Sequence, residues 1–139
     1  MLMVSSVEKK SSIIHQHWSA SLLDLGDGVA GINLHSVLKR ELNPIDGSIV
    51  QTLLYALNWV KENSYKGLLL SGDGVNFSAG ANLNLIVDAC YRKDYDSIDT
   101  FTKHIQNILQ ALRFAPFPVI AAPYGLVLGG GCETVNACD

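Results

Sequence analysis

Hydrophobic and polar positions follow two different periods along the chain, and the changes of period predict the first elements. Apolar residues stand on both sides of a Gly26-Asp27-Gly28 turn, which predicts a hairpin of two short strands within residues 20–36. From Ile45 or Asp46 onward the apolar positions take helical spacing, which predicts a helix whose apolar stripe covers a sheet; the stripe is Ile49, Leu53, Ala56, Leu57 and Val60.

The second half of the chain continues with strands and helices in turn. A continuous apolar run at 67–71 predicts a strand buried on both faces. Residues 82–93 read as helical, and 94–116 predict a long amphipathic helix that ends before Pro116. Its apolar face consists of Phe101, Ile105, Ile108, Leu109 and Leu112. The segment 118–131 predicts a further strand, and a last helix begins after it.

This order of elements predicts an α/β fold in which the strands pair in parallel through right-handed crossovers. Two glycine-rich segments, GDGVNFSAGAN at 72–82 and LVLGGGCE at 126–133, each follow a predicted strand. The carboxyl ends of parallel strands share one edge of a sheet, where ligands tend to bind. We therefore expect the two segments to face a single site, although Ala81 and Gly130 are far apart in sequence.

Composition limits the classes of function. The chain has 139 residues, of which 48% are hydrophobic, and its formal net charge of −3 excludes the basic field that nucleic-acid binding needs. No run approaches the roughly 18 apolar residues of a membrane span, and the N-terminus lacks the order of a secretory signal. We expect a cytoplasmic protein that has a polar leader or linker at 1–18 and one domain at 19–139.

Histidine and cysteine residues give little indication of a metal site. His15 and His17 stand two residues apart in the polar leader, where unstructured surface histidines are the expected interpretation. Cys90, Cys132 and Cys138 form an odd set without a CxxC spacing. Reduced and mostly buried thiols are therefore expected, rather than a disulfide framework or a zinc site.

The three consecutive glycines at 129–131 carry the candidate chemistry. A helix that begins at Gly129 or Gly130 points backbone N–H groups beyond the strand, and glycine lets an anion come close. Glu133 lies one turn deeper on the same face, where it reaches the atom beside that anion. Backbone donors beside an acid/base group are the parts that a thioester enolate requires, and the FSAGAN loop could add a second donor.

Each of these features also has a purely structural interpretation. The glycines could allow close packing of a helix on a strand, and Glu133 could be a favourable charge in the first turn of a helix. Cys132 could be a nucleophile with a lowered pKa, but a small packing residue is the better interpretation, because the sequence indicates no histidine base.

Two segments resemble the signatures of a known family. FSAGANL (Phe77–Leu83) and PVIAAPYGLVLGGGCE (Pro118–Glu133) are similar to those of the crotonase, or enoyl-CoA hydratase/isomerase, superfamily. The resemblance covers nearly everything after Ser19 and implies the N-terminal half of the ClpP/crotonase ββα-repeat spiral, incomplete in this chain. It also resembles the version that follows a 3-hydroxyacyl-CoA dehydrogenase in multifunctional fatty-acid oxidation enzymes.

The resemblance implies roles for particular residues. The backbone N–H groups of Ala81 and Gly130 would form the oxyanion hole for the thioester carbonyl, and Glu133 matches the first of two water-activating glutamates. The segment at Ser78 and Ala79 would contact coenzyme A, together with Ala81 and Gly129.

The family's second glutamate falls beyond Asp139, so the 139-residue chain is expected to lack full hydratase activity. Asn82 replaces an acidic residue of the family with little expected effect. Lys39 and Arg40 are better interpreted as surface cations than as ligands of CoA phosphates.

Three functions remain open at this point. The first is hydration of 2-enoyl-CoA to 3-hydroxyacyl-CoA in fatty-acid β-oxidation. An enoyl-CoA isomerase and a non-catalytic acyl-CoA-binding module are the alternatives. Hydration implies no metal and no cofactor, since acyl-CoA is the substrate, and NAD would belong only to a fused dehydrogenase domain. The expected partners are the acyl-CoA thioester and either further copies of the chain or a larger multifunctional polypeptide.

Overall fold

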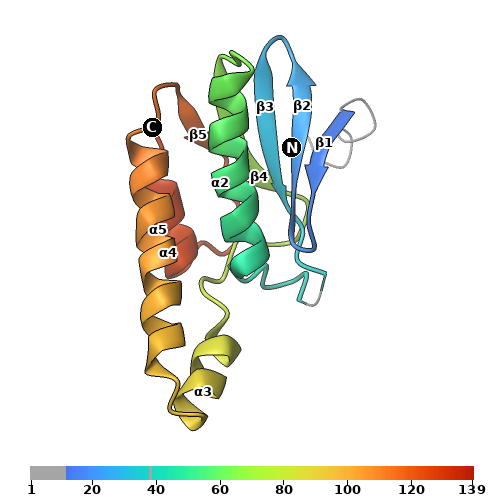
Figure 1. Cartoon of the computed structure of the whole chain (residues 1–139). Helices are drawn as coiled ribbons and strands as arrows, with labels where there is room; N and C mark the ends of the chain where they lie inside the picture. Colours follow the sequence, from blue (N-terminus) through green and yellow to red (C-terminus); the bar gives the residue numbers. More distant parts are fainter. Residues whose placement is uncertain (1–11, 38) are drawn as a thin grey trace.

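A computed structural model describes residues 12–37 and 39–139 of the chain. Its centre is a five-stranded mixed sheet in the order β1-β2-β3-β4-β5 (Figure 1). The two pairs at the β1 end are antiparallel, and β3–β4 and β4–β5 are parallel. The parallel pairing that the order of elements predicts is therefore confirmed. The strands are β1 (Ser12–Gln16), β2 (Ala20–Gly26), β3 (Val29–Leu34), β4 (Gly67–Gly72) and β5 (Val119–Ala121).

Four helices of the described residues accompany the sheet. The longest two lie side by side, with α2 packed against β2, β3 and β4 and with α4 packed against α2 (Figure 1). The main core therefore forms between α2 and the sheet, and its fully buried side chains include Leu22, Ile32, Ile49, Leu68 and Leu70. The helices are α2 (Gly47–Glu62), α3 (Leu83–Tyr91), α4 (Tyr95–Arg113) and α5 (Gly130–Asn136).

The predicted hairpin forms from β2 and β3. Gly26, Asp27 and Gly28 all adopt positive φ angles, of 87°, 53° and 79°, at its turn. Glycine and aspartate tolerate this left-handed region better than other residues. The Lys66 N–H donates to the Gly28 carbonyl over 2.7 Å, so the turn also fixes the chain as it enters β4.

Helix α2 begins where the sequence predicts. Asp46 is its N-cap, and the carboxylate accepts a hydrogen bond from the Ile49 N–H at 3.0 Å. The other carboxylate oxygen accepts from the Ser19 hydroxyl at 2.6 Å, which joins the start of the helix to the start of β2. All five predicted stripe residues are buried, so the helical pattern is confirmed.

The expectation of unstructured histidines at 15 and 17 is wrong. Residues 12–16 form β1 on the edge of β2, and the His15 ring stacks on Tyr55 of α2 with centroids 4.4 Å apart. The strand forms because β2, which begins at Ala20, turns the chain back and supplies the hydrogen-bond partners of residues 12–16. The rest of the predicted leader, 1–11, lies outside the described residues, and the boundary at residue 18 stays a prediction.

The predicted strand over 118–131 is too long. Regular pairing covers only Val119–Ala121, and the chain then runs as an extended loop. Pro123 has no N–H to donate, and Gly125 turns the backbone with a φ of 58°. The last helix begins at Gly130, inside the predicted range.

The other two helices form as predicted, but their packing is partial. Helix α4 ends at Arg113, before Pro116, and only Ile108 and Leu112 of its apolar face are fully buried. Helix α3 buries only Ala89. The periodicity therefore identified the helices correctly, while much of their apolar surface has no cover within the described part of the chain.

The expectation of mostly buried thiols is wrong. Cys90 and Cys132 are exposed, Cys138 is half-buried, and all three are free. Cys90 lies on the lightly packed helix α3, which explains its exposure. Burial raises the pKa of the Cys138 thiol to about 11, with a smaller contribution from the charge of Asp139.

Candidate functional site

The two glycine-rich segments lie side by side at the carboxyl edge of the parallel strands. The Ser78 N–H donates to the Leu126 carbonyl at 3.1 Å, and the Leu128 N–H donates to the Ser78 carbonyl at 3.0 Å. This short parallel bridge brings together segments that are almost 50 residues apart in sequence. The expectation that they face one site is therefore consistent with their observed contact.

A third segment, residues 42–46, closes the arrangement from the other side. The Ile45 N–H donates to the Gly80 carbonyl at 2.8 Å, and the Asn82 N–H donates to the Ile45 carbonyl at 3.0 Å. These bonds fix the residues on both sides of Ala81. In such a parallel bridge the N–H of the residue in between points away from the partner strand, so the Ala81 N–H faces the opposite direction.

Each of the three consecutive glycines meets a different requirement. Gly129 has a φ of 47°, in the left-handed region that favours glycine. At Gly131 a Cβ would lie 2.8 Å from the Ser78 Cβ, so only glycine allows this contact. At Gly130 a Cβ would meet only the Ile45 Cδ1 at 3.4 Å and the Ala81 nitrogen at 3.6 Å. Backbone conformation therefore explains Gly129 and packing explains Gly131, but a methyl group would fit at Gly130.

The backbone N–H groups of Ala81 and Gly130 adjoin each other at this point. The Gly130 Cβ position lies 3.6 Å from the Ala81 nitrogen, and the Gly80 Cβ position lies 3.4 Å from the Gly130 nitrogen. Within residues 12–37 and 39–139, neither N–H group donates a hydrogen bond. Two neighbouring N–H groups that have no acceptor in the described residues can together bind one carbonyl oxygen or oxyanion.

Glu133 lies in the first turn of α5, three residues after Gly130. Its N–H donates to the Gly129 carbonyl at 3.0 Å, and its side chain is exposed. Residues three apart share one face of a helix, so Glu133 and Gly130 lie on the same side of α5. The structure thus combines a pair of backbone donors with one solvent-accessible carboxylate.

Cys132 does not act as the small packing residue that we expected. The side chain is exposed, and its sulfur accepts a hydrogen bond from the Asn136 amide at 3.4 Å. No histidine in the described part of the chain contacts it, so the geometry offers no base for a nucleophilic role.

The segment predicted to contact coenzyme A is used partly for the fold. Ser78 is fully buried, and its hydroxyl accepts a hydrogen bond from the Gly80 N–H at 3.1 Å. The Ala79 N–H donates to the Leu42 carbonyl at 2.7 Å. A ligand at this segment would therefore meet the partly exposed Ala79 and the exposed Gly129 rather than the side chain of Ser78. Lys39 and Arg40 are exposed.

Two asparagines that the sequence analysis did not select hold the site segments in place. Asn43 is almost fully buried; its amide donates to the Phe77 carbonyl at 2.9 Å and accepts from the Ser36 N–H at 2.9 Å. Asn76 connects two further segments through its amide. The Asn43-Pro44 dipeptide is a turn signal that points to the first of these positions, and nothing in the local sequence indicates the second.

Tyr124 packs against Phe77 of the 72–82 loop. Its ring meets Phe77 edge to face, with centroids 6.4 Å apart, and its hydroxyl lies 2.8 Å from the Cβ position of Gly72. Burial raises the pKa of Tyr124, and the nearby charge of Asp73 raises it further. The phenol is therefore neutral at physiological pH, and its role is packing beneath the loop.

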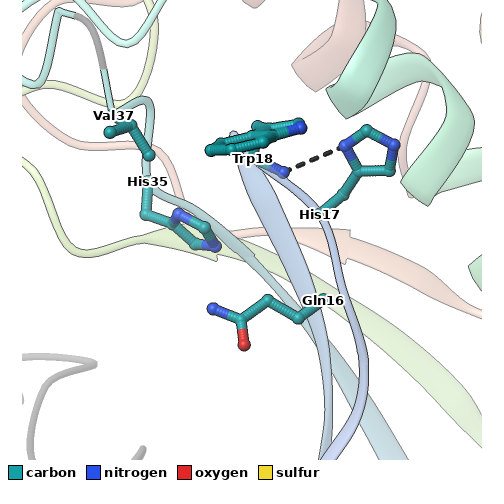
Figure 2. Close-up of a pocket in the computed structure, with 5 residues that line it drawn as sticks. All are labelled: Gln16, His17, Trp18, His35 and Val37. Carbon is teal, nitrogen blue, oxygen red and sulfur yellow. Dashed lines mark hydrogen bonds between the residues drawn. The ribbon is translucent and has the colours of Figure 1, made fainter.

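A separate cavity of about 510 Å³ lies beside the turn between β1 and β2 (Figure 2). Its walls are Gln16, His17, Trp18, His35 and Val37, and none of them belongs to the three site segments. The His17 Nδ1 accepts from the Trp18 N–H at 2.9 Å. The cavity has polar and apolar walls without a carboxylate, so the candidate chemistry is sought at Ala81, Gly130 and Glu133 instead.

Among residues 12–37 and 39–139, no helix combines the length and the apolar character needed to cross a membrane. The described residues also hold no group of three or more His, Cys, Asp and Glu side chains placed to bind a metal ion.

The fold and site together define an α/β protein whose parallel strands end at a pair of backbone donors. A family model described as enoyl-CoA hydratase/isomerase matches residues 24–139. That range is most of the chain, and the chain belongs to this family.

Relatives and solved structures agree with this assignment. The chain is 33% identical over 130 residues to the "Probable 3-hydroxyacyl-CoA dehydrogenase" of Bacillus subtilis (strain 168). The aligned segment covers 94% of this chain and 16% of the relative. An enoyl-CoA hydratase structure from Bacillus anthracis is 27% identical, with a TM-score of 0.76, over 87% of this chain and 45% of that one. An enoyl-CoA hydratase structure from Thermoplasma volcanium GSS1 is also 27% identical, with a TM-score of 0.75. The match covers 89% of this chain and 47% of that one. The chain thus spans about half the length of the similar structures, and the crotonase-type α/β fold is confirmed.

Proposed function

We propose that the protein containing this chain hydrates 2-enoyl-CoA thioesters to 3-hydroxyacyl-CoA in fatty-acid oxidation. The observation that supports the proposal most directly is the pair of neighbouring N–H groups at Ala81 and Gly130. Neither has an acceptor in the described residues, and Glu133 lies one helical turn after Gly130. Membership of the enoyl-CoA hydratase/isomerase family supports the same substrate class.

In the proposed reaction the thioester oxygen binds between the two N–H groups. The oxygen of a water molecule adds to C3 of the enoyl group, the C2–C3 π electrons move toward the thioester, and negative charge develops on its oxygen. Both donors stabilise this enolate, and a second carboxylic acid then gives a proton to C2. Glu133 orients the water and accepts its proton. The second carboxylate that such a hydration uses would come from outside the described residues.

The proposed chemistry requires no cofactor. The N–H groups supply the electrophilic stabilisation, and coenzyme A is part of the substrate. NAD would bind only to a dehydrogenase domain in the same polypeptide, an arrangement suggested by the name and the greater length of the Bacillus subtilis relative. Assembly into homo-oligomers, or into such a larger polypeptide, belongs to the same proposal.

Replacing Glu133→Gln in the complete protein tests the proposal. The amide keeps the size of the side chain and removes its basicity, so we expect the kcat for hydration of crotonyl-CoA to fall by about 100-fold or more. Cys132→Ser is the matched control, because it changes the adjacent exposed residue and should leave kcat within about twofold. An unimpaired Glu133→Gln enzyme would exclude the acid/base role.

An isomerase is the second candidate, because the described site presents a single carboxylate in the first turn of α5. Moving a proton between C2 and C4 of a 3-enoyl-CoA can use one such base, whereas hydration as proposed uses two carboxylates. Assay of the complete protein with a 3-enoyl-CoA separates the two activities. Conversion of that substrate without hydration of crotonyl-CoA would favour the isomerase, and binding without either reaction would favour a non-catalytic acyl-CoA-binding module.

A further inference from the structure

The side chain of Asn76 joins the segments that carry the two N–H donors. Its Nδ2 donates to the Glu41 carbonyl at 2.6 Å, and its Oδ1 accepts from the Leu126 N–H at 2.7 Å. Asn76 itself lies in the 72–82 loop, so one amide links the two glycine-rich segments to Glu41, the residue that precedes the third segment, 42–46.

On one side, the Asn76 link leads to Gly130. The Leu126 carbonyl accepts from the Ser78 N–H, and the Ser78 carbonyl accepts from the Leu128 N–H, two residues before Gly130. A shift of Leu126 would therefore pass along this bridge to the start of α5.

On the other side, the link leads to Ala81. The residue after Glu41, Leu42, accepts a hydrogen bond from the Ala79 N–H at 2.7 Å. Three residues further, Ile45 holds the carbonyl of Gly80 and the N–H of Asn82. The Asn76 side chain thus connects the segment that holds the residues beside Ala81 with the segment that leads to Gly130.

The local packing suits an amide at this position. Gly125 lies against Asn76, and a Cβ at Gly125 would come within 2.5 Å of the Asn76 Oδ1. An amide supplies a donor and an acceptor at the same distance from the backbone, whereas a carboxylate supplies acceptors only. The two backbone groups here require one of each.

We propose that Asn76 is a positioning residue that sets the spacing of the Ala81 and Gly130 N–H groups. This inference rests on the proposed function. Asn76 contacts no substrate atom and acts only through the two segments it joins. Hydrogen bonds weaken steeply when distance and angle depart from their optimum. A relaxed spacing should therefore weaken the hold on the developing oxyanion more than it weakens substrate binding.

The test uses the complete protein with a chromophoric substrate analogue, 4-dimethylaminocinnamoyl-CoA. Donors at the thioester oxygen polarise this conjugated thioester and shift its absorbance to longer wavelength, so the shift reports the oxyanion hole directly. Crotonyl-CoA kinetics and thermal unfolding are measured on the same preparations. The variants are Asn76→Ala, which removes both links, and Asn76→Asp, which keeps the shape and the oxygen that accepts from the Leu126 N–H but loses the donor to the Glu41 carbonyl. Asn84→Ala, at an exposed position of α3, is the control.

We expect Asn76→Ala to lose most of the absorbance shift and about tenfold or more in kcat, with KM changed by no more than about threefold. Asn76→Asp should fall between Asn76→Ala and the wild type, and Asn84→Ala should match the wild type. A wild-type shift and kcat in the folded Asn76 variants, with only a lower melting temperature, would overturn the proposal in favour of a structural role. If Asn76→Ala does not fold, a wild-type shift and kcat in Asn76→Asp would overturn it equally. The absence of any shift in the wild type would instead refute the donor pair itself, so the two failures are distinguishable.

Discussion

The region around α2 and the region around the candidate site are stabilised in different ways. Helix α2 buries seven side chains, and most of them pack into the hydrophobic core. The site segments are connected mainly by backbone bridges and by the amides of Asn43 and Asn76, and Leu126 and Leu128 remain 45% and 50% exposed.

This difference separates stability from activity. Burial of a leucine contributes about 1.5–3 kcal/mol without directional requirements. A hydrogen bond contributes only about 0.5–1.5 kcal/mol net but depends strongly on geometry. We therefore expect substitutions around α2 to change the free energy of unfolding and substitutions at the site to change the reaction.

The largest effect on stability is expected from Leu53→Ala. Leu53 is 3% exposed in the core, so its truncation leaves a cavity and should lower the free energy of unfolding by about 2–5 kcal/mol. The neighbouring Leu54 is 40% exposed, and Leu54→Ala is the matched control with an expected loss below about 1 kcal/mol. Urea denaturation of both variants measures the difference. Equal losses would show that α2 does not hold the core as described.

Gly130→Ala is expected to impair the reaction without unfolding the protein. Its added methyl group would lie 3.4 Å from the Ile45 side chain and 3.6 Å from the Ala81 nitrogen, in the space where the thioester oxygen is proposed to bind. We expect kcat/KM for crotonyl-CoA to fall by about 100-fold or more. The melting temperature should stay close to that of the wild type. Retained activity in this variant would place the oxyanion elsewhere.

A smaller effect is expected at the start of α2. Asp46→Ala removes both the cap on the Ile49 N–H and the bond from Ser19, so we expect a loss of about 1–2 kcal/mol in urea denaturation. Asp94→Ala removes the exposed N-cap of α4 and serves as the comparison. It should cost less than Asp46→Ala, because both of the Asp94 bonds are made to Ser97 within its own helix. A greater loss for Asp94→Ala than for Asp46→Ala would show that the bond from Ser19 adds nothing to the cap of α2.

The smallest effect concerns thiol reactivity and leaves the fold unchanged. Burial raises the pKa of Cys138 to about 11, so at pH 8 only about one thiol in a thousand is ionised there. The thiolate is the reactive form, and labelling of Cys138 should rise only as the pH approaches 11. Alkylation by iodoacetamide at pH 8, followed by peptide mass spectrometry, should modify the exposed Cys90 and Cys132 first. Early labelling of Cys138 would show that its side of α5 opens readily.

Much of the fold follows from local patterns in the sequence. The β2–β3 hairpin, α2 and β4 are encoded by a turn, a helical stripe and an apolar run, each within a short window. Strand β1 was missed because residues 12–16 were assigned to a polar leader, although β2, their antiparallel partner, begins at Ala20. The apolar face of α4 was identified but its partial burial was not, since periodicity shows which face is apolar but not whether another element covers it.

The candidate site was predictable to a similar degree. Topology and the family resemblance selected Ala81, Gly130 and Glu133, and the structure brings the first two together. Asn43 and Asn76 were not selected, because their amides reach backbone groups 34 and 50 residues away. Such long-range contacts have no signature in the local sequence. The chemical roles of all these residues stay predictions.

The three glycines at 129–131 also imply a pattern of divergence. Backbone conformation preserves the first of them, and the contact with Ser78 preserves the third, in any descendant that keeps the fold. At Gly130 only the proposed reaction would oppose a methyl group, so selection there should end when catalysis is lost. A lineage that has abandoned the chemistry should therefore drift to alanine at this position first, while its neighbours stay glycine.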